Sequence, residues 1–241
     1  PQDPYVSDLK NALQAPNSEH WFGTDKLGRD IFSRVIYASR ISLPATLTLV
    51  AIIFVAGTIL GTLAGYFGGW VDAVIMRLSD MMISFPGMVL AIAVAGIMGA
   101  SIKNAVIAIA IVSWSKYARL ARSMVLKVKK SLYIEAAIVN GTKTWKILLV
   151  HILPNMVTQM VVTAAADIGT MMLELASLSF LGFGATAPTP EWGLMLNEGR
   201  TYMAKAPWLM IYPGIAIVIC VVVFNMLGDS IRDVLDPRQD Q

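Results

Sequence analysis

Two carboxylates, Asp167 and Glu174, lie seven residues apart in an otherwise apolar stretch, residues 154–182, with Met171 between them. Seven residues are about two helical turns, so the three side chains would share one face of a helix. A charged group at membrane depth is expensive and by default faces the protein interior or a water-filled cavity. The face is therefore a candidate lining for a solute pathway, and its negative charge would suit a cationic metal complex or the amino terminus of a peptide.

The same carboxylates have a structural interpretation, which we prefer for Asp167: pairing with a lysine or arginine of a second membrane subunit. Met171 and Met172 beside Glu174 would also suit a soft metal, although most of the 14 methionines are expected to fill gaps in packing. Asp80 follows Arg77 by three residues, which predicts a local ion pair between them.

A second charged region is residues 116–146, which contain eight lysine or arginine residues and one acid, Glu135. A basic segment between two membrane spans is expected on the cytoplasmic side. Ser131 could cap a short helix that carries Glu135 in its first turns, and Gly141 could end that helix. Two short helices with a tight bend would form a knob that fits a groove on a partner protein. The alternative is an amphipathic stretch lying on anionic lipid headgroups.

Several kinds of chemistry find no support in the sequence. There is no GxxxxGK[ST] phosphate loop, and the string NGTKT around Gly141 lacks the required glycine-lysine pair. Only His20 and His151 are available beside the single Cys220, so no metal-ligand spacing and no internal disulfide can form. We expect a chain that is not an enzyme, holds no cofactor and binds no nucleic acid.

Composition identifies a membrane protein, since 56% of residues are hydrophobic, only 15% are charged and the mean hydropathy is +0.63. Residues 41–71, 81–102 and 206–228 contain no charged side chain, and about 20 apolar residues cross a hydrocarbon core. Two further runs, 104–124 and 154–182, are interrupted by charge. We therefore predict an all-α integral membrane protein with five transmembrane helices.

A cytoplasmic basic segment fixes the expected topology. Residues 1–40 become an extracytoplasmic lead-in with an interfacial helix, 41–230 a membrane domain that includes the loop 116–146, and 231–241 a cytoplasmic tail. Five spans with the first segment outside predict an upstream span, or a removed leader, before Pro1. Four basic residues of the lead-in oppose this topology, although Asp25 and Asp30 partly balance them; the four are Lys26, Arg29, Arg34 and Arg40.

Two features of the spans predict how they pack. Gly57, Gly61 and Gly65 repeat every four residues, so they line one helix face and allow another backbone to approach closely. We expect this packing within the subunit rather than at a dimer seam. Pro86 is expected to kink the second span.

The residues of the basic segment resemble a known motif. Glu135, Ala136 and Ala137, then Gly141, and then Leu153 with Pro154 follow the spacing of the EAA motif of ABC transporter permeases. In that family the loop inserts a coupling helix into the ATP-binding subunit. The generic pattern has isoleucine where this chain has His151, although Ile152 keeps the site apolar.

Three longer strings are similar to the second permease of dipeptide, oligopeptide and nickel importers: FGTDKLGRDIFSR at 22–34, ASLSFLGFGATAPTPEWGLMLNEGR at 176–200 and GDSIRDVLDPR at 228–238. The resemblance covers essentially the whole chain. It implies a type I importer permease core with a cytoplasmic coupling helix, in the plasma (inner) membrane of a bacterium or archaeon. The implied partners are a second permease, two ATP-binding subunits, an extracytoplasmic solute-binding protein and the lipid bilayer.

Three functions therefore compete. The first is the permease of an ATP-driven importer for di- or oligopeptides or for nickel, as a chelate, with a slight preference for nickel from the methionine-rich acidic face and the TAPTPEWG string. The alternative is an ion-coupled secondary transporter, which would carry inverted repeats that we do not detect in the sequence. A membrane scaffold without cargo is the third.

Overall fold

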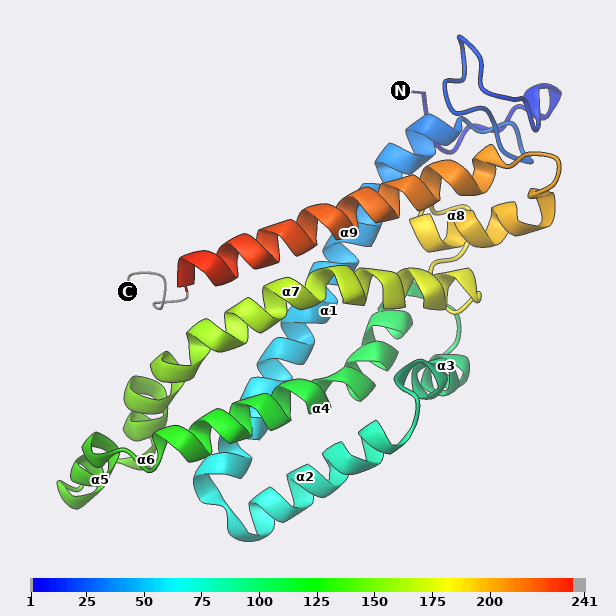
Figure 1. Cartoon of the computed structure of the whole chain (residues 1–241). Helices are drawn as coiled ribbons and strands as arrows, with labels where there is room; N and C mark the ends of the chain where they lie inside the picture. The colour runs from blue at the N-terminus through cyan, green and yellow to red at the C-terminus, as the bar shows by residue number, and fades with distance from the viewer. Residues whose placement is uncertain (1, 236–241) are drawn as a thin grey trace.

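A computed structural model describes residues 2–235, which form a bundle of long helices with a folded segment at one end (Figure 1). The order of the helices is η1 (Leu9–Asn11), α1 (Ile31–Phe67), α2 (Gly69–Ser84), α3 (Gly87–Met98), α4 (Ile102–Val128), α5 (Leu132–Val139), α6 (Thr144–Lys146), η2 (Ile147–Ile152), α7 (Leu153–Phe180), α8 (Trp192–Gly199), η3 (Arg200–Tyr202) and α9 (Trp208–Leu235). The all-α prediction is confirmed over these residues.

Helix α1 begins where Asp30 accepts a hydrogen bond from the amide of Ser33 at 2.8 Å, and it runs through Pro44 to Phe67. The interfacial helix that we expect to lead into the first span is continuous with that span and forms the first three turns of α1. Pro44 is exposed and lies inside α1 without dividing it, although a proline removes one hydrogen bond of the helix.

The glycine stripe of α1 packs against α4, as predicted. A Cβ on Gly61 would lie 2.7 Å from the Cβ of Ala121, and one on Gly65 would lie 2.8 Å from the Cβ of Val125. A Cβ on Gly57 would clash with Tyr117. Such distances are too short for carbon atoms, so the two backbones approach this closely only because these positions lack side chains.

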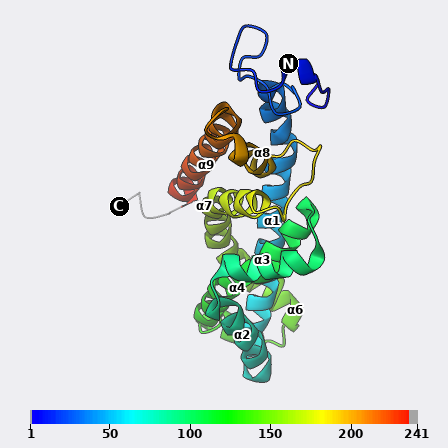
Figure 2. The ribbon, with the colours of Figure 1, turned by 90° about the vertical axis from the view of Figure 1, so that its right-hand side faces the viewer.

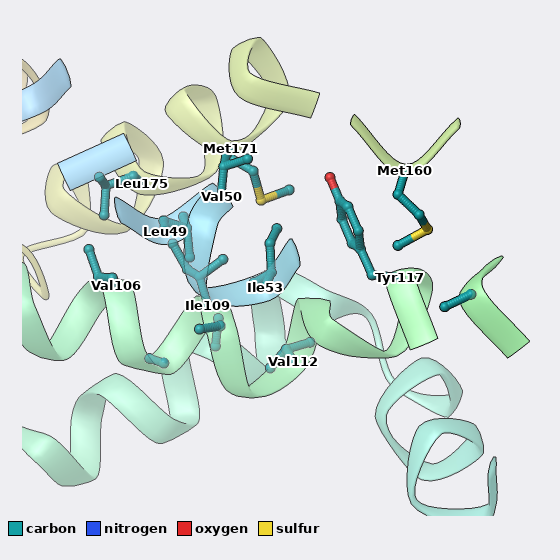
Figure 3. Close-up of a cluster of buried hydrophobic side chains, with 14 of the residues drawn as sticks. Leu49, Val50, Ile53, Val106, Ile109, Val112, Tyr117, Met160, Met171 and Leu175 are labelled. Carbon is teal, nitrogen blue, oxygen red and sulfur yellow. The ribbon is translucent and has the colours of Figure 1, made fainter. Parts of the chain in front are cut away.

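Beside the glycine contact, α1, α4 and α7 enclose an apolar core (Figure 3). Leu49 and Ile53 of α1 meet Ile109 of α4, and all three are almost fully buried. The ring of Tyr117 lies beside Met160 in the same cluster, with its hydroxyl directed toward α7 (Figure 3). This core fixes the position of α7 relative to α4, and so places the carboxylates of α7.

The predicted span 81–102 is wrong as a continuous helix. Chain direction changes by 96° at the break between α2 and α3, where Phe85 is extended and Pro86 precedes the first turn of α3. The expected kink at Pro86 is therefore a full break, since a residue before proline disfavours helical backbone. Helix α3 has 12 residues, about 18 Å at 1.5 Å per residue, which is too short to cross a bilayer alone.

Helix α8 lies between α7 and α9 near one end of the bundle (Figures 1 and 2). Glu191 caps it by accepting hydrogen bonds from the amides of Gly193 at 2.9 Å and Leu194 at 2.8 Å. Burial raises the pKa of the Glu191 carboxyl above its ordinary value, although these two amides act in the opposite direction.

The lead-in is folded rather than extended. Arg29 pairs with Asp25 at 2.6 Å and with Glu198 of α8 at 3.4 Å, and Arg34 reaches the same Glu198 oxygen at 3.4 Å. Both arginines are buried. Two of the four basic residues that opposed the expected topology, Arg29 and Arg34, are therefore neutralised by acids, and the network ties the lead-in to α8.

Within the described residues, three helical stretches are long and apolar enough to cross a membrane: α1, the continuous stretch Thr144–Phe180 and α9. The bent pair α2 and α3 adds a fourth if it forms one crossing. The predicted count of five is thus not confirmed. Residues 231–235 of the expected tail belong to α9, and the rest of that tail, 236–241, lies outside the described residues.

Candidate coupling and pathway sites

The predicted knob lies between α4 and α7, at the end of the bundle away from the lead-in (Figure 1). Helix α5 ends at Val139, after which the amide of Thr142 donates to the Ala137 carbonyl at 3.0 Å and the amide of Gly141 donates to the Ile138 carbonyl at 2.9 Å. Gly141 has φ +72°. This pair of hydrogen bonds is the Schellman ending, and it requires left-handed backbone at Gly141. The two short helices and the bend are as the sequence predicted.

One detail at the start of α5 differs from the prediction that the Ser131 side chain caps this helix. Ser131 occupies the N-cap position in extended conformation, but its hydroxyl donates to the Val128 carbonyl at 2.6 Å instead of accepting from the helix. The preceding residues belong to α4, so the predicted loop 116–146 begins inside a helix. Residues 129–146 form the actual connection between the two long helices.

The knob exposes apolar side chains. Ile134 anchors α5 in the same apolar cluster as Ile147 and Ile152. On the outer side Leu132 is 83% exposed and Val139 is 86% exposed, and Glu135 and Ala136 are exposed while Ala137 is half-buried. Apolar residues this exposed indicate a surface that another protein or the membrane covers.

The knob continues directly into α7. Helix α6 and the π-helical stretch η2 lead to Leu153, which is half-buried, and to Pro154, which is exposed in the first turn of α7. Asn155 donates its side-chain amide to the His151 carbonyl at 2.6 Å, which supplies a donor next to a proline that has none. His151 thus lies in η2, and Ile152 beside it is buried as expected.

Asp167 is paired within the chain. Its two oxygens accept hydrogen bonds from Lys116 Nζ at 2.7 and 2.8 Å, and Tyr117 donates its hydroxyl to Oδ2 at 2.9 Å. The Asp167 side chain is 11% exposed and that of Lys116 is 61% exposed. The cation that we expected from a second subunit therefore comes from α4 of the same chain.

The other two predicted pathway residues differ in how deeply their side chains are buried. Met171 packs in the core between α1, α4 and α7 (Figure 3), whereas Glu174 is half-buried. Met172 is also buried. The thioethers that favoured a soft metal thus point into packed protein, and among residues 2–235 no three acidic, histidine or cysteine side chains are grouped to hold a metal ion.

Sequence reasoning missed the partners of the α4 cations. Asp80 pairs with Arg119 and not, as the sequence had predicted, with Arg77. Arg122 pairs with Asp72 through two contacts of 2.5 Å. Lys116, Arg119 and Arg122 recur every three residues, which is the spacing of one broad helix face. That spacing was the available signal that these cations belong to a helix and not to a loop.

A protein-family model now accounts for this arrangement. Residues 57–241 match the model described as "Binding-protein-dependent transport system inner membrane component". The chain belongs to this family. It is a non-catalytic, multi-pass inner membrane subunit of a binding-protein-dependent ABC importer, and permeases of this kind work in complexes with ATPase subunits.

Relatives support the assignment over nearly the full length. The chain is 47% identical over 95% of its length, and 75% of the relative, to a dipeptide transport system permease, DppC, of Alkalihalophilus pseudofirmus. It is 50% identical over 96% of its length, and 77% of the relative, to a glutathione transport system permease, GsiD, of Pectobacterium atrosepticum. It is 41% identical over 99% of its length, and 86% of the relative, to the nickel transport system permease NikC of Escherichia coli K12.

The fold is that of solved ABC permeases. A chain of the MetNI methionine ABC transporter in an inward-facing conformation superimposes with a TM-score of 0.68 at 17% identity, covering 86% of this chain and 98% of the other. At that identity the likeness concerns the fold alone. The resemblance stated from the EAA spacing is confirmed at the level of family.

Proposed function

We propose that this chain and a second, related permease enclose the pathway of an importer that two ATP-binding subunits drive and an extracytoplasmic binding protein supplies. The observation that carries the proposal is the helical knob of residues 129–146, joined to both α4 and α7. A knob with exposed apolar residues that continues into two long helices can transmit movement of a partner to the membrane.

Within the knob we assign the ATPase contact to α5 and its ending. The start of α7 would transmit the movement of this contact to the membrane. The residues are Glu135, Ala136, Ala137, Gly141, Leu153 and Pro154. Exposed Leu132 and Val139 extend this contact surface. Ion-coupled secondary transport, the alternative, has no need for such a knob.

We infer five crossings: α1, the bent pair α2 and α3, α4, the stretch from α6 to α7, and α9. This count places the start of α1, the lead-in and α8 on the extracytoplasmic side. The knob and the end of α9 lie in the cytoplasm, which agrees with the positive-inside rule because the knob has several unpaired cations. Those cations are Lys129, Lys130, Lys143 and Lys146, for which residues 2–235 offer no ion pair.

We further propose that the predicted pathway residues act at different depths. Glu174, half-buried, would be the carboxylate that meets cargo or pathway water. Asp167 would act through Lys116, whose ammonium it holds, and Met171 would support both from the core. The net charge of this group is then that of one carboxylate rather than two.

For the cargo, a di- or oligopeptide is the first candidate and chelated nickel the second. The relatives named for dipeptide and glutathione are 47% and 50% identical, against 41% for the one named for nickel. The burial of Met171 and Met172 removes the feature that had favoured nickel.

The test uses Gly141, where only backbone conformation is at issue because a Cβ there would meet nothing within 4 Å. Gly141→Val should disrupt the Schellman ending at a cost of about 1–2 kcal/mol and uncouple ATP hydrolysis from uptake. Gly141→Asn is the matched control, since asparagine tolerates left-handed backbone. ATPase activity and uptake are measured on the complete complex in proteoliposomes.

Normal coupling in Gly141→Val would overturn the assignment of the knob. Uptake that persists without ATP, driven by an ion gradient, would instead support the secondary transporter.

A further inference from the structure

Helix α7 has an exposed stripe that the helices packed against it, α1, α4, α8 and α9, leave uncovered. Its exposed or half-buried positions recur at intervals of three and four residues along the whole helix, which is the repeat of one helical face. Five of the seven positions are polar, and the other two are Ala166 and Leu173. The polar members are Asn155, Gln159, Thr163, Thr170 and Ser177.

Hydrogen bonding within α7 leaves this stripe polar toward its surroundings. The hydroxyls of Thr163 and Ser177 donate to the carbonyls of Gln159 and Leu173 at 2.9 and 2.7 Å, so their oxygen lone pairs remain as acceptors. Gln159 and Thr170 have no side-chain hydrogen bond within residues 2–235, so the amide and the hydroxyl are free to donate and accept outward.

Lipid cannot be what covers this stripe. In hydrocarbon an unpaired amide or hydroxyl costs several kcal/mol, and lipid-facing positions are accordingly apolar. The same protein shows the contrast: α9 exposes Val218, Ile219 and Val222, and α7 exposes Val161 on its opposite side. Val161 follows Gln159 by two residues and so points about 160° away from it around the helix.

Polar groups of two neighbouring helices, α4 and α9, border the stripe. On one side Lys116 of α4 reaches α7 at Asp167, between the turns of Thr163 and Thr170, and its side chain is mostly exposed. On the other side Asn225 of α9 is exposed and lies against the backbone of α7, since a Cβ on Gly169 would come within 2.5 Å of Asn225 Oδ1. An exposed lysine in mid-helix requires water or a polar neighbour.

We propose that this polar stripe of α7, with Lys116 and Asn225 at its borders, lines the water-filled pathway and forms hydrogen bonds with the cargo. The inference rests on the proposed function and extends it to a substrate class: solutes with amide and carboxylate groups, such as short peptides. Neutral amides and hydroxyls pair with peptide N–H and C=O groups, and the ammonium of Lys116, which gives two of its three N–H groups to Asp167, keeps one N–H for a carboxylate. Several weak sites in a row allow cargo to enter and still leave.

Water access is tested by single cysteines in a Cys220→Ser background, in the complete complex in proteoliposomes. Gln159→Cys and Thr170→Cys should react with a charged, membrane-impermeant thiol reagent during turnover, and the modification should block uptake. Val161→Cys and Val218→Cys are the matched controls and should react at least tenfold more slowly. Equal, slow reaction at all four positions would overturn the proposal, as would crosslinking of Thr170→Cys to a tightly packed helix of the second permease.

Cargo recognition is tested with radiolabelled trialanine and its C-terminal amide, delivered by the cognate binding protein. Gln159→Leu and Thr170→Val should each lower uptake of trialanine threefold to tenfold, the effect of one lost hydrogen bond, with assembly and basal ATPase activity retained. Lys116→Gln should remove the preference for the free acid over the amide. Unchanged uptake and preference in all three variants would refute recognition by the stripe.

Failure of this inference and failure of the proposed function give different results. If the stripe cysteines are inert while uptake remains ATP-dependent and sensitive to Gly141→Val, only the stripe is misassigned. If the cysteines react but uptake never depends on ATP, the pathway assignment stands and the importer mechanism falls.

Discussion

At the scale of single residues, the pair of Lys116 and Asp167 shows how a buried carboxylate at membrane depth is stabilised. The carboxylate is buried and held by one ammonium and one phenol, while the lysine side chain is mostly exposed. Removing one member of such a pair is worse than removing both, because the remaining charge loses its partner.

We therefore expect Lys116→Met to reduce the stability of the complex more than the double variant Lys116→Met/Asp167→Leu. The coupling energy should be about 0.5–1 kcal/mol, the low end for contacting residues, because solvent screens the exposed lysine. Thermal unfolding of the purified complex, run as a double-mutant cycle, measures it. Additive effects of the two single changes would show that the ion pair does not hold α4 to α7.

At the scale of elements, the contact of α1 with α4 depends on three glycines whose missing side chains leave room for the other backbone. Gly57→Ala should push Tyr117 and α4 away and lower the stability of the complex by about 1–3 kcal/mol, as overpacking does. Gly214→Ala in α9 is the matched control, because its Cβ would meet nothing within 4 Å. Thermal unfolding and complex recovery should separate the two variants, and equal behaviour would contradict the close contact.

At the scale of the whole molecule, a buried ion network joins the lead-in to α8, two segments far apart in the chain. Arg29→Met leaves Asp25 with a distant partner, Arg34 at 3.8 Å. The change should lower the free energy of local unfolding of residues 2–30 by about 3–5 kcal/mol. Lys26→Met removes only an exposed contact of 4.0 Å to Glu198, worth at most about 1 kcal/mol.

Protease added from the lead-in side should therefore cleave the Arg29→Met complex within residues 2–30 much faster than wild type, with Lys26→Met close to wild type. Equal cleavage of the two variants would mean that the network does not hold the lead-in.

The sequence by itself determined the helical membrane class, the positions of most long helices and the geometry of the knob. These follow from local rules: a run of apolar residues must be helical in lipid, and a glycine after a short helix allows its Schellman ending. The glycine repeat likewise indicated a close helix contact, which the structure places between α1 and α4.

Tertiary structure alone decided which charges meet and which helix faces remain open. Lys116, Arg119 and Arg122 pair with Asp167, Asp80 and Asp72 across 39 to 51 positions of sequence, and no local pattern encodes such partners. The open face of α7 is also invisible in the sequence, because Asp167 and Thr170 are one turn apart and only the packing of α4 decides that the first is covered and the second exposed. Periodicity gives the faces of a helix, whereas contacts between distant segments determine what each face meets.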